Sequence, residues 1–507
     1  MGEMTMMSSN EKQHSILKAR AAHTRPKLLV DVTTSIGLLG GAPIGITRVE
    51  TKLARALLDA EKLNPMPVIM KADGTLRAIE METARHILDL WDTQIDVPVK
   101  LRRAYDHIEI DLTADRVDSA EPRKANRTLR QKIARKISAA RVLFRQPGKI
   151  YRGTATWDEL TTQFMLKQGE SPAVAHAHEL DLYGKIQREA YENAQLIVTP
   201  TPVDYFWTAG LYSHMIRPRP LLELMTGSGM RVGSLLYDVI RVLHPEYNPP
   251  DIDRDVHRAN TLDLMEASDM LLSISGWTRD TCAELGREEG RTHASIEVLP
   301  LGVDVAGPVL SDAKQKVLRK AVTERPFALT VGTIEPRKNI THLLDVWELL
   351  SRDGTPPPLD LVIVGRKGHR ADEEVSRILA HPQFGTNIFW LDSCPDSALT
   401  SLYRMATVVL CPSHAEGWGL PVSEALVQGR PVIASDNTAH PEAGFGQAIL
   451  LATQDVAQWA KKINEIAAAP DSFLPDLTQF SHPTWESAGA RLVELIEARI
   501  ATPSPKD

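Results

Sequence analysis

Residues 413–426 read SHAEGWGLPVSEAL, and this stretch decides the fold of the 507-residue chain. It follows the apolar run 407–411, whose unbroken hydrophobicity is typical of a strand buried on both faces of a parallel sheet. From Leu420 onward the pattern is that of a helix with a proline in its first turn. Gly417 and Gly419 allow the backbone of the strand-to-helix turn to approach a ligand closely. The stretch therefore predicts a ligand site at the carboxyl end of a strand in an α/β sheet.

Two carboxylates frame this turn. Glu416 lies in the loop and Glu424 lies about one turn into the helix, so we expect both side chains to border one cleft. The free N–H groups at the start of the helix favour an oxygen-rich or anionic ligand. The alternative is a helix cap with two solvated glutamates. Because two glutamates eight positions apart recur by chance in a long chain, the prediction depends on the glycines around them.

The segment resembles the E-x7-E motif of retaining glycosyltransferases of the GT-B fold, specifically family 4, whose usual form is E-G-F-G-L-P-x-x-E-A. Trp418 stands where phenylalanine is commoner. The resemblance implies an α/β architecture of two doubly wound, Rossmann-like domains that face a cleft. It also implies that Glu416 contacts hydroxyls of the transferred sugar and that Glu424 binds the donor ribose. The other donor-binding residues of the segment are then Gly417, Gly419 and Leu420.

A second motif, EPRKN at 335–339, carries two adjacent cations. Arg337 and Lys338 stand at the start of a predicted helix, where the helix dipole disfavours positive charge. This placement makes sense if an anion occupies the cleft, since arginine offers a planar fork to phosphate oxygens and lysine a point charge. The motif resembles the family's P-R-K-N, whose cations bind the donor diphosphate and neutralise the leaving group. A solvated pair with Glu335 is the alternative.

The same resemblance completes the expected donor site and mechanism. Gly332 would allow close approach to a phosphate, and the loop that contains Cys394 would flank the base. Retention would follow a front-face route in which the leaving diphosphate helps to remove the acceptor proton. Charge stabilisation and positioning then supply most of the catalysis. No cofactor and no metal ion are expected, and the nucleotide-sugar is a substrate.

The first half of the chain supplies the expected acceptor or phosphate loop. Gly45 and Arg48 belong to the segment GITRV, which resembles the G-I-x-R-V start of family 4 enzymes that build bacterial surface polysaccharides. A solvated helix residue is the alternative for Arg48. Asp238 matches the aspartate of the family's H-D-L-I-P segment, but Tyr237 replaces the histidine before it. A catalytic histidine at 237 is therefore excluded, and the residue that takes its place is left open.

Length and alternation of strands with helices predict several domains. The predicted organisation is a disordered leader 1–25, an N-terminal acceptor-binding domain 26–305, a linker 306–324, a C-terminal nucleotide-sugar-binding domain 325–483, and a closing helix and tail 484–507.

Within the N-terminal domain, residues 72–190 are predicted to form a helical insertion that departs from the family pattern. Its part 121–150 holds ten lysines or arginines against one acid, and its apolar residues recur at helical spacing. This combination predicts docking on an anionic membrane surface. A solvated basic arm is the alternative.

Composition narrows the classes of function. A formal net charge of -7 argues against general nucleic-acid binding. Three cysteines without metal-ligand spacing suit a reducing cytoplasm, and no apolar run is long enough to span a bilayer. We therefore expect a cytoplasmic enzyme, peripheral on the inner face of the membrane.

The sequence thus predicts a retaining hexosyltransferase that uses a nucleotide-sugar donor, with GDP-mannose the first choice. The expected acceptor is a growing, lipid-linked glycan. Two other classes stay open. One is a catalytically silent GT-B scaffold subunit, and the other is a GT-B sugar epimerase or phosphorylase.

Overall fold

The computed structural model describes residues 26–37, 39, 45–70, 75–92, 99–103, 106–110, 174–194, 197–209, 223–224, 227–249, 253–304, 307–476, 478 and 482–502. The basic segment 121–150 lies outside the described residues, so the membrane prediction is not tested. Within the described residues, no helix combines the length and the apolar character that a bilayer crossing requires.

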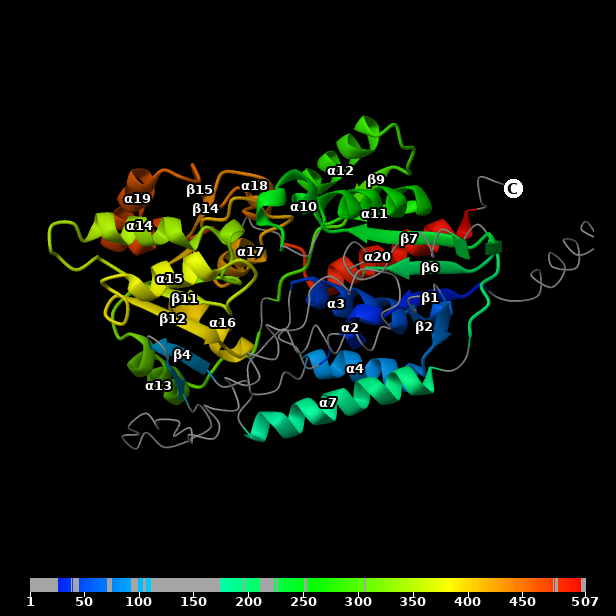
Figure 1. The fold of residues 1–507 in the computed structure, drawn as a ribbon, viewed down its shortest axis with the longest axis horizontal. Helices are drawn as coiled ribbons and strands as arrows, with labels where there is room; N and C mark the ends of the chain where they lie inside the picture. Colours follow the sequence, from blue (N-terminus) through cyan, green and yellow to red (C-terminus); the bar gives the residue numbers. More distant parts are fainter. Residues whose placement is uncertain are drawn as a thin grey trace, which may run out of the picture.

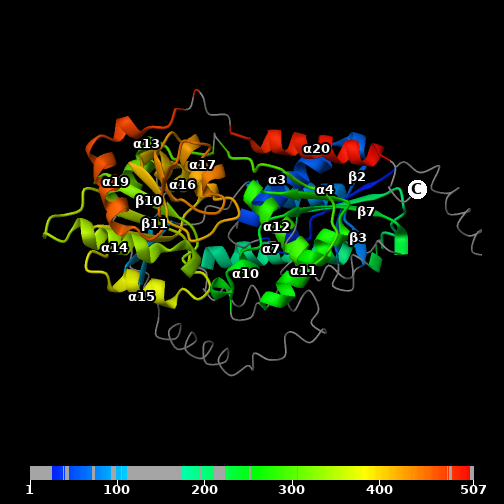
Figure 2. The ribbon, with the colours of Figure 1, turned by 90° about the horizontal axis from the view of Figure 1, so that it is seen from above.

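Two sheets lie in separate lobes, side by side (Figures 1 and 2). Within the described residues, the first sheet has seven strands, in the order β3 (Leu76–Ala78), β2 (Pro65–Met70), β1 (Leu28–Asp31), β6 (Tyr205–Thr208), β7 (Arg231–Leu236), β8 (Met270–Ser273) and β9 (Ile296–Val298). All of its pairs are parallel except β2 with β3. Strand order reverses between β1 and β6, as in doubly wound sheets.

The second sheet has eight strands among the described residues, in the order β15 (Ile449–Leu451), β14 (Val432–Ser435), β13 (Val408–Cys411), β10 (Phe327–Val331), β11 (Asp360–Val364), β12 (Ile388–Ser393), β4 (Val99–Arg103) and β5 (Asp106–Ile110). Its first six strands are parallel, and order reverses between β10 and β13. The GT-B prediction of two doubly wound sheets is confirmed.

Residues 99–103 and 106–110 differ from the prediction of a helical insertion. They form the β4–β5 hairpin, which pairs antiparallel with β12 and so completes the edge of the second sheet. In Figure 1 strand β4, coloured blue, lies beside the yellow strand β12 of the second lobe. The described remainder of 72–190 is strand β3 and the helices α4 (Met81–Asp92) and α7 (Val174–Asn193).

Helices cover both faces of each sheet, because side chains of alternate strand residues point to opposite faces. One face of the first sheet packs on α3 (Gly45–Asp59), α4 and α20 (Trp485–Ala501), and the other on α11 (Arg254–Ala267) and α12 (Gly276–Glu288). One face of the second sheet packs on α14 (Ile340–Leu350), α15 (Asp372–Ala380) and α19 (Val456–Ala468), and the other on α13 (Asp312–Val322), α16 (Asp396–Met405) and α17 (Leu420–Val427).

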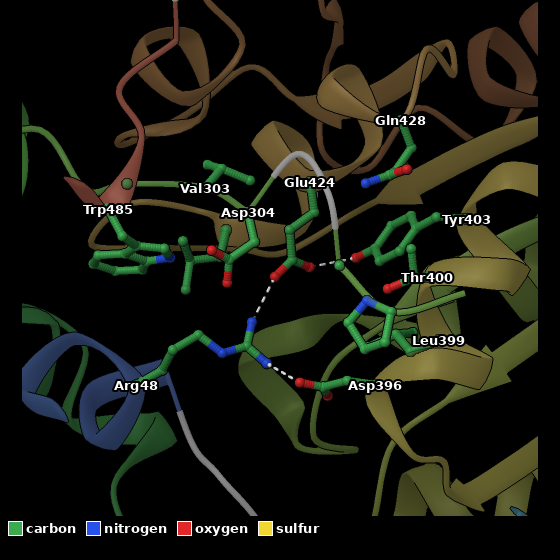
Figure 3. Close-up of a pocket in the computed structure, with 14 residues that line it drawn as sticks. Arg48, Val303, Asp304, Asp396, Leu399, Thr400, Tyr403, Glu424, Gln428 and Trp485 are labelled. Atoms are coloured by element: carbon green, nitrogen blue, oxygen red, sulfur yellow. Dashed lines mark hydrogen bonds and ion pairs between the residues drawn. The ribbon is translucent and has the colours of Figure 1, made fainter. Parts of the chain in front are cut away.

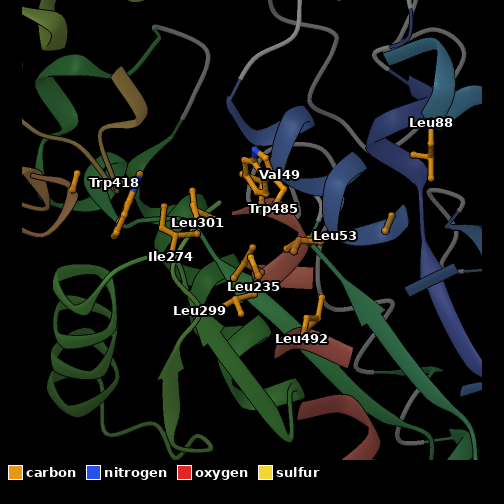
Figure 4. Close-up of a cluster of buried hydrophobic side chains, with 14 of the residues drawn as sticks. Val49, Leu53, Leu88, Leu235, Ile274, Leu299, Leu301, Trp418, Trp485 and Leu492 are labelled. Carbon is orange, nitrogen blue, oxygen red and sulfur yellow. The ribbon is translucent and has the colours of Figure 1, made fainter. Parts of the chain in front are cut away.

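A single apolar cluster joins the two halves (Figure 4). Leu53 and Leu235 of the first half lie in it, with Trp418 of the second half and Trp485 and Leu492 of the closing helix. Helix α20 ends the described chain yet packs on α3, where a Cβ on Gly489 would lie only 2.5 Å from the Cβ of Ala56. Helix α20 therefore returns from the second half to pack on the first.

A buried carboxylate pair marks the reversal of strand order in the first sheet. Asp31 ends β1 and accepts a hydrogen bond from Thr208 Oγ1, at the end of β6, at 2.9 Å. Glu50, on α3, accepts hydrogen bonds from the backbone N–H and the hydroxyl of Ser35, both at 2.7 Å. Burial, with the charge of Asp31 added, raises the pKa of Glu50 to about 8. Glu50 is therefore mostly protonated at neutral pH.

This pair predicts a pH-dependent stability. The pKa of Glu50 is higher in the folded than in the unfolded chain, so its contribution is complete below the unfolded value of 4.5 and is lost as pH rises towards 8. One unit of pKa corresponds to about 1.4 kcal/mol, so the loss is on the order of a few kcal/mol. Glu50→Gln should flatten the decline of unfolding free energy between these pH values, whereas the exposed Glu82→Gln should not. Parallel pH profiles for wild type and Glu50→Gln would contradict the prediction.

Candidate active site

The two motifs meet where the strand order of the second sheet reverses. The loop after β10 runs from Gly332 through a 3-10 turn, Pro336–Lys338, and the loop after β13 leads to Glu416. Asn339, held at φ 54°, donates from Nδ2 to the carbonyl of Pro412 at 3.0 Å. These contacts bring both loops to the carboxyl edge of the sheet, where ligands bind in doubly wound folds.

Two glycines let the strand ends approach each other beyond the limit for other residues. Gly332 and Gly365, which follow β10 and β11, have φ values of 152° and 153°. A Cβ on Gly365 would lie 1.9 Å from the carbonyl oxygen of Gly332. A Cβ on Gly332 would lie 3.3 Å from Cε of Lys338, so this glycine keeps backbone beside the lysine side chain. A side chain at either position would therefore collide with backbone or crowd Lys338, and the close approach of Gly332 to a phosphate stays a prediction.

Arg337, Lys338 and Glu416 form one ionic cluster, in which Glu416 is buried and the two cations are partly buried. The carboxylate of Glu416 lies 2.8 Å from Arg337 Nη1 and 2.5 Å from Lys338 Nζ. Arg337 also pairs with Glu335 at 2.7 Å and donates to the carbonyl of Ala415 at 2.6 Å. Burial opposes ionisation of Glu416, but the two cations outweigh it and hold its pKa well below the usual range. The alternative pairing with Glu335 exists as well, so Arg337 is shared between two carboxylates.

The glycines of the opening motif make room for the elements around Glu416. Gly419 adopts φ 100°, and a Cβ there would lie 2.8 Å from Cδ2 of the buried His440. A Cβ on Gly417 would lie 2.7 Å from the carbonyl oxygen of Tyr237, in the first half of the chain. The backbone N–H of Glu416 donates to Thr438 Oγ1 at 2.9 Å. Thr438 thus holds the backbone of Glu416, and the loop that carries Glu416 lies against the opposite half.

Glu424 lies apart from this cluster, in a cavity of about 80 Å³ (Figure 3). Its Oε1 accepts from Arg48 Nη1 at 2.8 Å, and its Oε2 accepts from the hydroxyl of Tyr403 at 2.7 Å. Asp396 lies 3.6 Å from the other terminal nitrogen of Arg48. Leu420 also lines this cavity, and a Cβ on Gly45 would lie 3.7 Å from Cδ1 of Leu420. The two glutamates of the motif therefore have different surroundings.

Asp238 lines a larger cavity, of about 200 Å³, between the two halves. Burial raises the pKa of Asp238, while the nearby charge of Arg337 acts in the opposite direction. Tyr237 turns its hydroxyl inward, donating to the carbonyl of Ala209 at 2.5 Å. Arg337 reaches this cavity from the second half. Asp238 is therefore an ionisable group that the first half presents beside the Arg337–Lys338–Glu416 cluster.

Sequence reasoning did not find the contacts that hold the halves together at the site. Glu442, in the short helix α18 (His440–Ala443), accepts from the backbone N–H groups of Gly276 and Trp277 at 2.6 and 2.7 Å. This carboxylate occupies the positive end of the α12 dipole, a favourable place for an anion. Tyr247 stacks on His414 with ring centroids 5.7 Å apart. Such contacts join segments far apart in sequence, and no local pattern announces them.

A cation from the β4–β5 hairpin was also missed. Arg102 lies 4.4 Å above the ring of Trp390 and pairs with Asp392 at 3.3 Å, at the end of β12. Cys394 follows in the same loop and is half-buried, and burial raises the pKa of its thiol. Its sulfur lies 3.6 Å from the carbonyl oxygen of Pro395. Cys394 lines neither of the two cavities described above.

The arrangement provides two cations beside a buried carboxylate, with two cavities that residues of both halves line. The cations can neutralise a developing diphosphate charge, and the carboxylate can accept hydrogen bonds from sugar hydroxyls. The structure brings Arg337, Lys338, Glu416 and Asp238 together, and it groups Arg48 with Glu424 instead.

Comparison with known proteins identifies the relatives of this arrangement. Residues 312–475 match a family model described as glycosyl transferases group 1. The chain is 26% identical over 296 residues to the serotype-specific mannosyltransferase WbdA of Escherichia coli, covering 57% of this chain and 36% of that protein. It is 28% identical over 222 residues to the O-antigen chain mannosyltransferase B of Escherichia coli, covering 42% of this chain and 55% of that protein. The match thus spans about a third to about half of these relatives.

A solved structure shares the architecture of almost the whole chain. The sucrose-phosphate synthase (tll1590) from Thermosynechococcus elongatus superposes with a TM-score of 0.53, covering 94% of this chain and 100% of that one at 15% sequence identity. At this identity the likeness concerns the fold alone.

Proposed function

We propose that this chain, in which residues 312–475 form a glycosyl transferases group 1 domain within a GT-B fold, transfers a hexose from a nucleotide-sugar to a growing glycan with retention of anomeric configuration. One observation carries the proposal. Arg337 and Lys338 converge with Glu416 at the reversal point of the second sheet, where a diphosphate and a sugar can be held side by side.

The donor would lie across the carboxyl edge of the second sheet. Its diphosphate would take the two cations as partners, and Gly332 supports this because it leaves the backbone beside Lys338 uncovered. The transferred sugar would bond to Glu416, which the cations keep ionised and therefore able to accept hydrogen bonds. The ribose would bond to Glu424 in the adjoining cavity. GDP-mannose is the proposed donor, supported by the mannosyltransferase names of the relatives.

Transfer would proceed on one face of the sugar. The bond between the anomeric carbon and the diphosphate oxygen breaks, the acceptor oxygen forms its bond on the same face, and the acceptor proton passes to the leaving diphosphate. Arg337 and Lys338 would stabilise the charge that develops on the diphosphate, which is the main catalytic contribution of the protein. The expectation that no metal ion is required stays a prediction.

The acceptor would enter the cavity of about 200 Å³ that Asp238 lines. Polar side chains of Arg241, Tyr247 and Asn260 face it together with aliphatic ones such as Ile240, a mixture that suits the hydroxyls and the C–H face of a sugar ring. Arg337 is shared between this cavity and the ionic cluster. The acceptor hydroxyl would thus arrive beside the reacting diphosphate.

The proposal predicts that Arg337→Ala and Lys338→Ala lose both nucleoside diphosphate affinity and turnover. Each removes a charge-assisted contact of about 1.5–3 kcal/mol, equivalent to roughly ten- to a hundredfold in affinity. Nucleotide-sugars are first screened by ligand-dependent thermal stabilisation, and affinities are then measured by calorimetry. Lys461→Ala, on the exposed face of α19, is the matched control. Unchanged affinity in both cleft variants would refute the donor site, and donor binding without turnover would favour the silent scaffold.

We also propose that residues 121–150 hold the enzyme on the inner membrane face, where a lipid-linked glycan would be presented. The segment carries ten basic residues and one acid inside a chain of net charge -7. Basic residues near an anionic leaflet contribute about 1 kcal/mol each, within a Debye length. Wild type should bind vesicles of anionic phospholipid at low salt and release them at high salt. Charge reversal at Arg127, Arg130, Lys132 and Arg135 should abolish binding. Wild type that ignores such vesicles would make this segment a solvated arm.

A further inference from the structure

Arg48 reaches from the first half of the chain into the cavity of the second (Figure 3). Helix α3 carries it, and its guanidinium donates to Glu424 at 2.8 Å while Asp396 lies 3.6 Å from its other terminal nitrogen. Both acids belong to the second half, Asp396 at the start of α16 and Glu424 in the middle of α17. Arg48 therefore has two carboxylates within reach, of which Glu424 is the closer.

The two partners of Glu424 differ in how they can leave it. Tyr403 is buried on α16, in the same half as Glu424, and its hydroxyl holds Oε2 at 2.7 Å. Arg48 donates to Oε1 from the opposite half. A movement of the two halves relative to each other can therefore break this hydrogen bond without disturbing the second sheet. A carboxylate has about four lone-pair sites, so Tyr403 can stay bound while new donors arrive.

Both carboxylate oxygens of Glu424 already have a partner, Arg48 at Oε1 and Tyr403 at Oε2. A ribose that binds Glu424 through Oε1 competes with the Arg48 guanidinium for this oxygen, and Arg48 is the partner that the opposite half supplies. Asp396 offers it an alternative partner less than 4 Å away, so its charge need not become unpaired.

We infer that Arg48 is a positioning residue that exchanges Glu424 for Asp396 when a nucleotide binds. The inference rests on the proposed function, because it takes Glu424 as the group that binds the donor ribose. The exchange has two consequences with opposite signs. Arg48 weakens nucleotide binding because it must first give up Glu424, and it supports transfer because its pairing with Asp396 draws α3 onto the donor half once the nucleotide is present.

The test measures GDP and UDP affinity by calorimetry and transfer by steady-state kinetics. Arg48→Met should bind the diphosphate about three- to tenfold more tightly than wild type while its kcat falls, and Arg48→Lys should restore part of both values. A residue that merely supported the fold would not raise affinity while lowering kcat. Arg55→Met is the matched control, because Arg55 lies on the same helix and pairs with Asp89 within the first half.

A double-mutant comparison separates the exchange from direct contact of Asp396 with the nucleotide. Asp396→Asn should weaken diphosphate binding in wild type but not in the Arg48→Met background, since the alternative partner matters only while the arginine is present. Equal weakening in both backgrounds, or an Arg48→Met variant that binds no more tightly than wild type, would overturn the inference. In those outcomes the proposed function survives. Absence of diphosphate binding to wild type would overturn both.

Discussion

Replacing Glu416 with glutamine is expected to remove most transfer activity while strengthening the stabilisation that a nucleoside diphosphate gives. The carboxylate now neutralises Arg337 and Lys338 at 2.8 and 2.5 Å in a buried position. Losing one partner of such a cluster costs up to about 3–5 kcal/mol, because Lys338 loses its carboxylate partner while Arg337 keeps Glu335. The unliganded variant should therefore unfold at a lower temperature than wild type.

A bound diphosphate returns the missing negative charge to the two cations. Its stabilising effect, measured as the rise in unfolding temperature at saturating GDP or UDP, should be larger in Glu416→Gln than in wild type. Transfer should nevertheless fall by about a hundred- to a thousandfold, the range seen when one preorganised group of this kind is lost. A Glu→Gln change at the exposed Glu494 supplies the control. If the diphosphate stabilises both enzymes equally, Glu416 does not compete for the site that the phosphates use.

Gly365→Ala is expected to be the most damaging single methyl group in the second half. The added Cβ would lie 1.9 Å from the carbonyl oxygen of Gly332 and 2.6 Å from its carbon, and both are backbone atoms. Neither can move alone, because Gly332 donates to Val364 at 2.9 Å and Gly365 donates to Leu391 at 2.8 Å. We expect a loss of about 4 kcal/mol or more, or failure to fold.

A second glycine separates this clash from backbone strain. Gly354 has φ 75° in open space, so Gly354→Ala should cost only about 1–2 kcal/mol. Denaturant unfolding compares the two variants directly. If the unfolding free energies of Gly365→Ala and Gly354→Ala differ by less than about 1 kcal/mol, the close approach of the two strand ends is not required for stability.

Local sequence patterns predicted the second half well. The strands β10 and β13 coincide with apolar runs of the sequence. The EPRKN motif follows β10 and the motif that contains Glu416 follows β13, both at strand ends as expected. The first half was harder to predict. The apolar run within 195–198 is typical of a strand, but the strand β6 lies at Tyr205–Thr208, and Ile197 makes an isolated bridge to Arg77. Short apolar runs do not specify which of two neighbouring segments pairs with β1.

The candidate site likewise contains some contacts that the sequence predicts and others that it does not. Arg337, Lys338 and Glu416 come from two compact motifs, and the fold of one sheet brings them together. Glu424 instead pairs with Arg48 of the first half, which is 376 positions away along the chain. The sequence marked both residues and assigned them to different substrates, because spacing along the chain carries no information on contacts between halves. Glu442 on the start of α12 was invisible for the same reason.

The β4–β5 hairpin and helix α20 mean that neither lobe is a continuous piece of the polypeptide. The hairpin belongs to the first third of the chain but completes the second sheet, and α20 comes from the end but covers the first. A cut within 306–324 would leave β12 of the C-terminal fragment with an uncovered edge, which favours association with other chains. It would leave α3 of the N-terminal fragment without α20, the helix that packs on it. The two lobes are thus interwoven through covalent connectivity, and an exchange of lobes between relatives would have to carry both of these outlying segments with it.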